Sequence, residues 1–365
     1  MDALHERIIE EGIRIQQVPA PTFHEVARAQ FVFERFQAEK NISVEMDPTG
    51  NVLVCLKGKE NNSAPILISA HLDTVFPLET NLRVTRESDR IFGAGIGDNS
   101  MGVAGLFGLL WSLTGRNIHL KSDLWLIANV CEEGLGNLKG MGAVVDRFGD
   151  QTKGYIVLEG MALGHIYHRA LGVRRYSITI LTGGGHSWTD YGQPSAVHEL
   201  ADLASKLTAL TMPPKYRTTL NVGKISGGTS VNTIAAEASL ELDLRSENQQ
   251  TLESIIQKVE QAVASIKRSG VEVRLEEIGR RPVGEIPDSH LLVRQAQSCL
   301  AEQGIQAVLN IGSTDANLPL SLGYPAVTIG LSNGGSGHTV HEYIFTEPLK
   351  KGMEQLVRLV QKIDS

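Results

Sequence analysis

Short apolar runs alternate with helical patterns from the start of the chain to residue 159. The runs are typical of strands and lie at 51–58, 65–70, 122–130 and 153–159, with a helical pattern near 99–114. Alternation of this kind indicates a layered α/β sheet. The same texture resumes at about 288, with a helix, a strand at 324–330 and a last helix from about 347.

The pattern of polar and apolar residues is different between residues 171 and 280. "GVRRYSITILTG" alternates polar and apolar residues, and helical patterns near 194–210 and 248–268 separate three further strand-like runs. The order βαββαβ is that of a ferredoxin-like module with an antiparallel sheet. Because the ends of compact domains often lie close together, we expect this module, 171–280, to be inserted in an α/β domain made of 1–170 and 281–365.

The composition excludes several classes of protein. The 365 residues are 42% hydrophobic and 21% charged, and the net charge of −7 gives no basic surface for a nucleic acid. No run approaches the roughly 20 apolar residues that cross a bilayer, and the first 21 residues have helix periodicity rather than a signal peptide's apolar stretch. The sequence therefore predicts a cytoplasmic protein with no nucleic-acid or membrane partner.

The three cysteines, Cys55, Cys131 and Cys299, are an odd number and lie far apart in the sequence. This spacing argues against a disulfide framework and against a cysteine zinc cluster. We expect buried free thiols at all three positions. His119, His165 and His168 belong to no motif, and we expect ordinary surface or loop residues there.

Histidines and carboxylates follow the predicted strands at the points where these end. In open α/β sheets, ligands bind beyond the carboxyl ends of the strands, so these side chains are expected at one edge of one sheet. A further carboxylate, Asp98, lies in the glycine-rich turn "GAGIGDNSMG" before a helix. The residues at the strand ends are His71, Asp73, Glu132, Glu133, Glu159, His338 and His341.

A set of imidazoles and carboxylates without cysteine suits zinc, with cobalt or manganese as alternatives. More carboxylates are present than one ion requires, so a pair of ions about 3.5–4 Å apart, bridged by one carboxylate, would use them. One member of the Glu132–Glu133 pair can then bind metal while the other takes a proton from water.

Each motif also has a simpler interpretation. His71-x-Asp73 could be a hydrogen-bonded surface pair, Glu159 could cap a helix, and Asp98 could be a turn or N-cap residue. The "GAGIG" stretch fails the dinucleotide fingerprint, because Asp98 stands where the third glycine should be. Only the coincidence of all these residues at strand ends favours the metal site.

Several motifs recur in a fixed order along nearly the whole chain: H-x-D-T-V at 71–75, the loop with Asp98, E-E-G at 132–134, Glu159, G-G-H-S at 184–187, N-x-I and D-x-R within 232–245, G-S-T-D-A-N at 312–317 and H-x-x-x-E at 338–342. In this order they resemble the dinuclear zinc exopeptidase and deacylase family. That family includes peptidase T, carboxypeptidase G, acetylornithine deacetylase, succinyl-diaminopimelate desuccinylase and aminoacylase.

The resemblance implies a three-layer α/β catalytic domain with an inserted ferredoxin-like lid and dimerisation domain. It also implies roles for individual residues. Asp98 would bridge two divalent ions, most simply Zn²⁺, with Co²⁺ or Mn²⁺ as substitutes. Asp73 would accept a hydrogen bond from the imidazole of His71. Glu132 would be the general base. The terminal metal ligands would be His71, Glu133, Glu159 and His338.

The lid would complete the site. By the same resemblance, His186 would reach the active site of the partner subunit in a homodimer and stabilise the oxyanion, while Asn232 and Arg245 would hold the substrate. We choose His338 over His341 as the ligand because Glu342 stands four residues after His338, the family's usual spacing. Ser100 replaces the lysine that relatives often place two residues after the bridging aspartate, which weakens the assignment to a subfamily.

The sequence therefore predicts a metal-dependent hydrolase that cleaves an amide bond in a small peptide or an N-acyl amino acid. A peptidase T-like or carboxypeptidase-like exopeptidase is the first interpretation. An N-acyl amino acid deacylase of the acetylornithine deacetylase or desuccinylase type is the alternative. A catalytically inactive dimeric binding protein on the same scaffold is a third reading.

Overall fold

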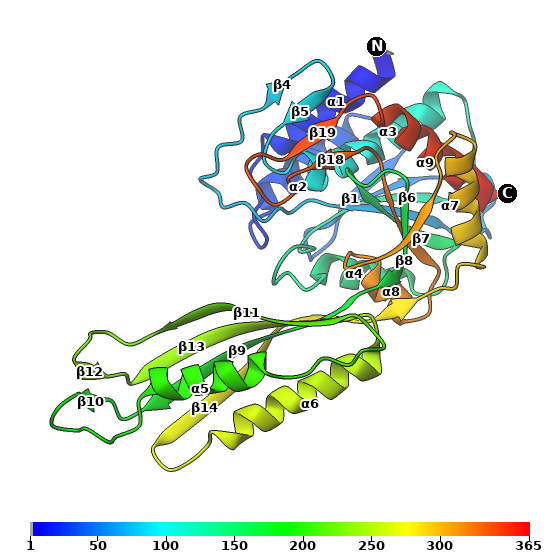
Figure 1. The fold of residues 1–365 in the computed structure, drawn as a ribbon. Helices are drawn as coiled ribbons and strands as arrows, with labels where there is room; N and C mark the ends of the chain where they lie inside the picture. The colour runs from blue at the N-terminus through cyan, green and yellow to red at the C-terminus, as the bar shows by residue number, and fades with distance from the viewer. Residues whose placement is uncertain (1–2) are drawn as a thin grey trace. The chain divides into compact units, whose positions relative to one another are not determined.

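The computed structural model describes residues 3–365, which form two compact units (Figure 1). One unit comprises the chain up to Ala170 together with Gly284–Ser365, and the other is Leu171–Val283. The second unit extends past the predicted boundary at 280, because its last long strand, β14, continues to Arg281.

The first unit is built on a nine-stranded mixed sheet in the order β1-β2-β6-β3-β7-β17-β8-β15, with β16 paired to β8. The four central strands, β6, β3, β7 and β17, run parallel, so their carboxyl ends share one edge. The strands are β1 (Ser43–Met46), β2 (Val52–Leu56), β3 (Ile66–His71), β6 (Leu124–Asn129), β7 (Gly154–Glu159), β8 (His165–Ala170), β15 (Gly284–Glu285), β16 (Val308–Gly312) and β17 (Ala326–Gly330).

Helices cover both faces of this sheet (Figure 1). Helices α1, α3 and α9 pack together on one face, with α7 beside α9, whereas α4 and α8 contact each other on the other face. The expected three-layer α/β fold is confirmed. The helices are α1 (Ala3–Gln16), α2 (Val26–Gln37), α3 (Met101–Gly115), α4 (Lys139–Phe148), α7 (Leu291–Ala301), α8 (Asn317–Ser321) and α9 (Leu349–Asp364).

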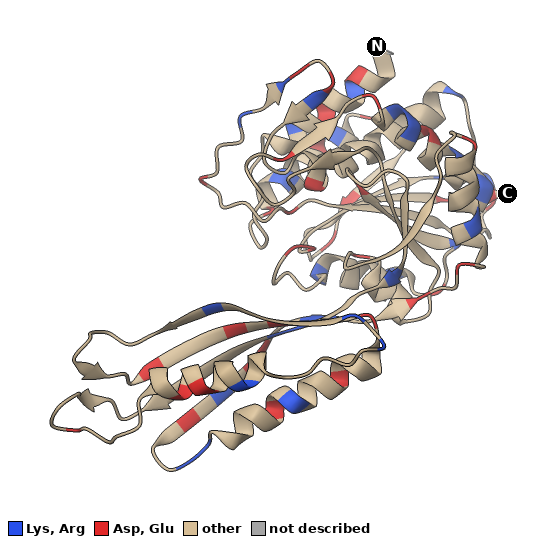
Figure 2. Ribbon diagram, in the orientation of Figure 1, with Lys and Arg blue, Asp and Glu red and all other residues tan. Residues whose placement is uncertain are grey.

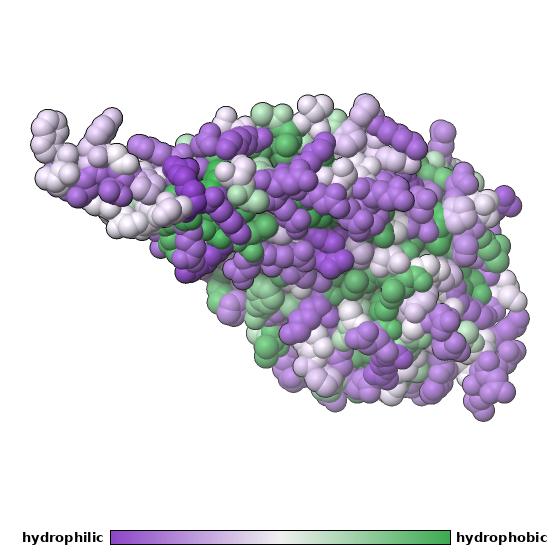
Figure 3. All heavy atoms as spheres, turned by 90° about the horizontal axis from the view of Figure 1, so that it is seen from below, coloured by the Kyte–Doolittle hydropathy of each residue, from purple (hydrophilic) through white to green (hydrophobic). Residues whose placement is uncertain are grey.

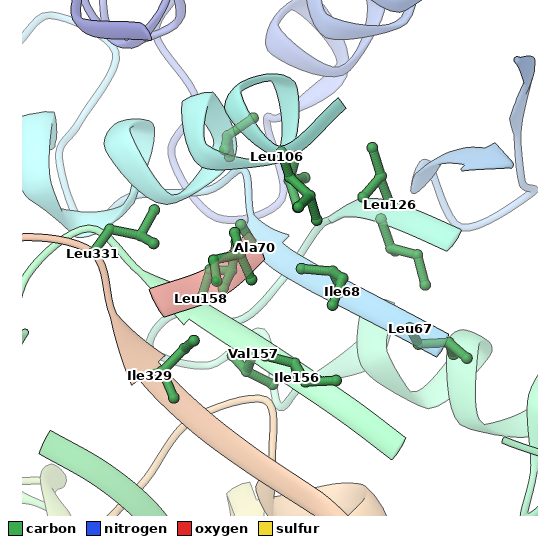
Figure 4. Packing of buried hydrophobic residues seen from close by; sticks show 14 of the residues in the cluster. Leu67, Ile68, Ala70, Leu106, Leu126, Ile156, Val157, Leu158, Ile329 and Leu331 are labelled. Atoms are coloured by element: carbon green, nitrogen blue, oxygen red, sulfur yellow. The ribbon is translucent and has the colours of Figure 1, made fainter. Parts of the chain in front are cut away.

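Helix α3 is the central helix of the core. It is apolar on every side, as a fully enclosed helix should be, and its residues from Met101 to Leu113 are all buried. Figure 4 shows Leu106 of α3 among side chains from strands β3, β6 and β7. Gly105 permits close packing here, because a Cβ at this position would lie 2.3 Å from Leu331 Cδ1.

A small four-stranded sheet, in the order β18-β19-β5-β4, joins the loop after β17 to the segment that precedes Asp98. Its strands are only two or three residues long, and the sequence analysis did not predict them. They are β4 (Thr85–Arg86), β5 (Arg90–Phe92), β18 (Gly334–Gly335) and β19 (Tyr343–Phe345). Pairing of β19 with β5 holds two segments together that are far apart in the sequence.

The second unit contains a four-stranded antiparallel sheet in the order β11-β13-β9-β14, as expected for a ferredoxin-like module. Helices α5 (Ala196–Thr208) and α6 (Gln249–Ser265) pack on one face, where alternate residues of β9 and β13 are buried. A two-stranded ribbon pairs β10 (Gly185–His186) with β12 (Thr233–Ile234). The long strands are β9 (Gly172–Thr182), β11 (Thr218–Gly227), β13 (Glu237–Ser246) and β14 (Val271–Arg281).

Charged residues of both signs are scattered over the ribbon (Figure 2). Hydrophilic and hydrophobic residues are likewise mixed on the face drawn in Figure 3. Among residues 3–365, no helix is long and apolar enough to span a bilayer. Cys55, Cys131 and Cys299 are buried free thiols, as predicted.

One minor expectation was wrong. His168 is not a surface or loop residue, because it lies buried in β8 and its Nδ1 is 2.7 Å from the carbonyl oxygen of Ile286. Strand β8 pairs with the edge strand β15, and Ile286 directly follows that strand.

Candidate metal centre and active site

Asp98 lies between two imidazoles. Its Oδ1 is 3.1 Å from His71 Nε2, and its Oδ2 is 3.0 Å from His338 Nε2. His71 ends strand β3, and His338 lies in the loop that follows β18. A carboxylate that presents each oxygen to a different imidazole has the arrangement of a bridging metal ligand.

Two glutamates flank this group. Glu133 Oε1 is 3.2 Å from His338 Nε2, and Glu159 Oε2 is 3.8 Å from His71 Nε2. Ligand atoms of His71, Asp98 and Glu133 all lie within 4.8 Å of one another, close enough to share a metal ion. The structure thus brings all five predicted ligands to one edge of the large sheet.

The two candidate histidines of the last motif have different environments. His338 has a positive φ of 63°, and its ring contacts Asp98 and Glu133. Both residues are exposed, and the main-chain N–H of His341 donates to Thr339 Oγ1 at 3.2 Å. The geometry therefore favours His338 as the ligand.

Asp73 is completely buried and holds the turn that carries both adjacent glutamates. Its Oδ1 accepts the main-chain N–H of Glu132 at 2.9 Å, and its Oδ2 accepts the N–H of Glu133 at 2.8 Å. The expected bond from His71 takes a different form: His71 Nδ1 is 2.9 Å from the main-chain oxygen of Asp73 and 3.6 Å from its Oδ1. The carboxylate is directed to the two amides instead.

The electrostatics of this group suit a divalent cation. Burial, reinforced by the charges of Asp98 and Glu132, raises the pKa of Glu159 well above its usual range. Hydrogen bonds to Asp98 and Glu133 raise the pKa of His338 to about 10. The side chains offer imidazole nitrogens and carboxylate oxygens, which are the ligand atoms that zinc accepts. The neighbouring carboxylates repel one another, and a bound cation would offset this repulsion. The residues fit a metal centre.

Glu342 holds the loop that carries Asp98, a role that the sequence analysis did not assign. It is fully buried, and its Oε1 accepts the main-chain N–H groups of Gly97 at 2.7 Å and Asp98 at 2.8 Å. Burial raises its pKa to about 7, although these bonds act in the opposite direction. The sequence signal was the H-x-x-x-E spacing, which served only to choose between two histidines.

Asn99 links the same loop to the end of β7. Its side-chain Nδ2 donates to the carbonyl oxygen of Leu158 at 2.8 Å, and its Oδ1 accepts the N–H of Gly160 at 2.9 Å. These two main-chain groups flank Glu159. Gly102 leaves room for this arrangement, because a Cβ there would lie 1.9 Å from Asn99 Oδ1.

The remaining predicted residues lie in the second unit. His186 is exposed, and its Nδ1 accepts the main-chain N–H groups of Trp188 at 3.2 Å and Thr189 at 3.4 Å. A neutral imidazole that accepts at Nδ1 carries its proton on Nε2. His186 therefore presents a hydrogen-bond donor to its surroundings.

Asn232 lies at the same end of this unit as His186, because β10 and β12 pair and the carbonyl oxygen of Asn232 accepts the N–H of Ser187 at 3.1 Å. Arg245 does not. It stands eight residues along β13 from Glu237, about 26 Å at roughly 3.3 Å per residue. Its Nε donates to Asp243 Oδ1 at 2.8 Å, and Asp243 also accepts from Arg175, which the sequence analysis missed.

Residues 67–362 match the model of the family described as "Peptidase family M20/M25/M40". The chain belongs to this family. The resemblance found in the sequence is thereby confirmed, and with it the class of activity, metal-dependent hydrolysis of amide bonds.

Relatives and solved structures agree with this assignment. Succinyl-diaminopimelate desuccinylase from Corynebacterium glutamicum is 24% identical over 335 residues, which cover 89% of this chain and 88% of the relative. Aminopeptidase PepT from Bacillus cereus has a similar fold, with a TM-score of 0.80 and 23% identity over 99% of each chain. The YXEP protein from Bacillus subtilis, a dinuclear metal-binding peptidase, covers 99% of this chain and 98% of its own, with a TM-score of 0.71 and 18% identity.

Proposed function

We propose that the protein is an exopeptidase that hydrolyses an amide bond of a small peptide, with two divalent cations and Glu132 as the general base. The observation that carries this proposal is the position of Asp98 between His71 and His338, beside a buried pair of adjacent glutamates. The ligands would be His71, Asp98, Glu133, Glu159 and His338. When bound, a pair of Zn²⁺, Co²⁺ or Mn²⁺ ions would supply Lewis acidity and a more acidic water.

Side chains of the protein would transfer the proton, position the base and stabilise the oxyanion. Glu132 would take the proton of the attacking water and later deliver it to the leaving amine. Asp73 accepts hydrogen bonds from the main-chain N–H groups of Glu132 and Glu133, which fixes the backbone from which both carboxylates extend. His186, with its proton on Nε2, would donate a hydrogen bond to the oxyanion.

Arg245 would bind the carboxylate of the substrate. Its side chain is 41% exposed, and a hydrogen bond to Asp243 orients the guanidinium. Guanidinium groups bind carboxylates with paired hydrogen bonds, and both peptides and N-acyl amino acids carry a carboxylate near an amide. The N-acyl amino acid deacylase is therefore the second candidate, and the similarity to a desuccinylase favours it.

We further propose a homodimer. His186 lies near the start of β13, and Arg245 lies eight residues along that strand, about 26 Å at roughly 3.3 Å per residue. Within one lid the two side chains are therefore too far apart to contact the same small substrate. His186 of the partner subunit would complete the site. Strand β11 is an exposed edge of the lid sheet, where a second copy could add its own edge strand. The buried free thiols support a reducing, cytoplasmic location.

A substrate screen with a base variant tests the proposal. Wild-type protein and Glu132→Gln would be assayed with tripeptides, dipeptides, and N-acetyl and N-succinyl amino acids, with and without chelator. We expect Glu132→Gln to bind the same number of ions and to lose turnover by about 10³–10⁴-fold. Glu60→Gln is the control, because Glu60 is exposed and belongs to none of the motifs of the site.

The outcomes separate the candidates. Hydrolysis of peptides alone supports the exopeptidase, and hydrolysis of acyl amino acids alone supports the deacylase. Unchanged turnover in Glu132→Gln contradicts the role of the base. Two bound ions without hydrolysis of any compound would favour an inactive binding protein.

A further inference from the structure

Residues 130–133, which follow strand β6, are held by hydrogen bonds to side chains rather than by pairing with another strand. Four consecutive main-chain N–H groups each donate to a buried side-chain oxygen: Val130 to Asn51 (3.0 Å), Cys131 to Glu25 (3.1 Å), Glu132 to Asp73 Oδ1 (2.9 Å) and Glu133 to Asp73 Oδ2 (2.8 Å). The acceptors come from three separate loops. This segment carries the proposed base.

Glu25 is the least expected of these acceptors. It directly precedes helix α2, but its side chain makes no hydrogen bond to the first turn of that helix. It is buried instead, 5% exposed, and accepts from the N–H and the thiol of Cys131, 106 residues away. Burial of a carboxylate is costly, so its hydrogen-bond partners indicate what it does.

Both partner groups belong to Cys131, the residue directly before Glu132. Cys131 adopts a left-handed backbone conformation, with φ of 60°, which residues other than glycine seldom adopt. This conformation sets the direction in which the chain continues to Glu132. A bond that fixes the N–H of Cys131 therefore fixes the origin of the Glu132 side chain.

We propose that Glu25 is a positioning residue for the general base, acting through the main chain of Cys131. The inference rests on the proposed role of Glu132. Asp73 anchors the amides of both glutamates, whereas Glu25 anchors the residue before them. Loss of Glu25 should therefore disturb proton transfer more than it disturbs metal binding at Glu133.

Three variants test this inference. Glu25→Ala removes the acceptor, Glu25→Asp keeps the charge but shortens its reach, and Glu25→Gln keeps an acceptor oxygen at the same distance. Glu34→Ala, at an exposed glutamate on helix α2, is the control. The assay uses whichever compound of the screen is cleaved, together with metal content, melting temperature and hydrogen–deuterium exchange over residues 130–134.

For Glu25→Ala and Glu25→Asp we expect kcat to fall about 10–100-fold while KM and metal content change by less than about twofold. The acid limb of the kcat–pH profile should move by about half a pH unit or more, and exchange over 130–134 should rise. Glu25→Gln should stay within about fivefold of wild type, which a purely electrostatic role would not allow.

Several results would overturn the inference. One is a kcat of Glu25→Asp within about twofold of wild type, with unchanged exchange at 130–134. Another is a loss of activity that follows a loss of metal. A third is a Glu25→Gln variant as damaged as Glu25→Ala. If Glu25→Ala does not fold, the Asp and Gln variants decide the question. If Glu132→Gln were as active as wild type, the proposed function would fail separately, and the exchange data would still report on Glu25.

Discussion

The polar residues of the two units are held in different ways. In the first unit most site residues are buried and fixed by bonds from distant segments: His71 is 2% exposed, Asp73 0% and Glu132 5%, whereas the side chain of His338 is 57% exposed. In the second unit His186 and Asn232 are exposed and are held mainly by residues within a few positions of themselves. The first unit thus fixes its site residues through bonds between distant segments, whereas the second presents His186 and Asn232 at its surface.

Replacement of Asp98 should give the largest effect. Asp98→Ala removes the carboxylate shared by both imidazoles, so we expect turnover to fall by at least about 10⁴-fold and the metal content to drop. Metal analysis and hydrolysis of the cleaved compound are the measurements. Asp89→Ala, an exposed aspartate in the same unit, should match wild type. Full metal content with normal turnover would contradict the bridging role of Asp98.

His186→Ala tests the exposed unit. We expect kcat to fall about 10²–10³-fold, the usual loss when one oxyanion donor is removed. Because the side chain is exposed, metal content and melting temperature should not change. A mixture of His186→Ala with Glu132→Gln subunits should recover part of the activity, since a hybrid dimer contains one site with both groups intact. No recovery in a proven hybrid would argue against exchange of His186 between subunits.

Glu342 tests the support of the metal loop. Glu342→Ala removes the acceptor for two main-chain amides beside Asp98, so we expect metal affinity to fall about 10–100-fold. Chelator competition measures the dissociation constant. Glu347→Ala, an exposed neighbour, should leave it unchanged. An unaltered affinity in a folded Glu342→Ala protein would show that the loop keeps its geometry without this residue.

The sequence predicted the sheet edge well because apolar runs of five or six residues end directly at His71 and Glu159. The rule for parallel strands then places these ends together. Glu25, Asn99 and Glu342 could not be found this way. They bind main-chain groups of other segments, as far as 247 residues away. Any residue type can supply such a main-chain group, so the sequence does not reveal the partner. The short strands of the small sheet were missed because two or three residues carry no periodicity.

The smallest expected effect concerns the lid. Burial alone would raise the pKa of Asp243, but hydrogen bonds from Arg245 and Arg175 lower it below its usual range. Its stabilising contribution is thus fully present above the unfolded pKa of about 3.9 and is lost as the pH falls through the lower folded value. Denaturant unfolding at pH 6 and pH 3 should show a smaller loss of stability for Asp243→Asn than for wild type. Equal losses would contradict this explanation, with Glu272→Gln as the control.

The proposed hydrolysis requires a pair of cations at one edge of the large sheet. Anomalous X-ray diffraction from zinc-soaked crystals, recorded on either side of the zinc absorption edge, tests it most directly. We predict two peaks per chain, one on each side of the Asp98 carboxylate, with His71 and His338 bound to different ions. A single peak, or peaks away from these three side chains, would contradict the two-metal centre.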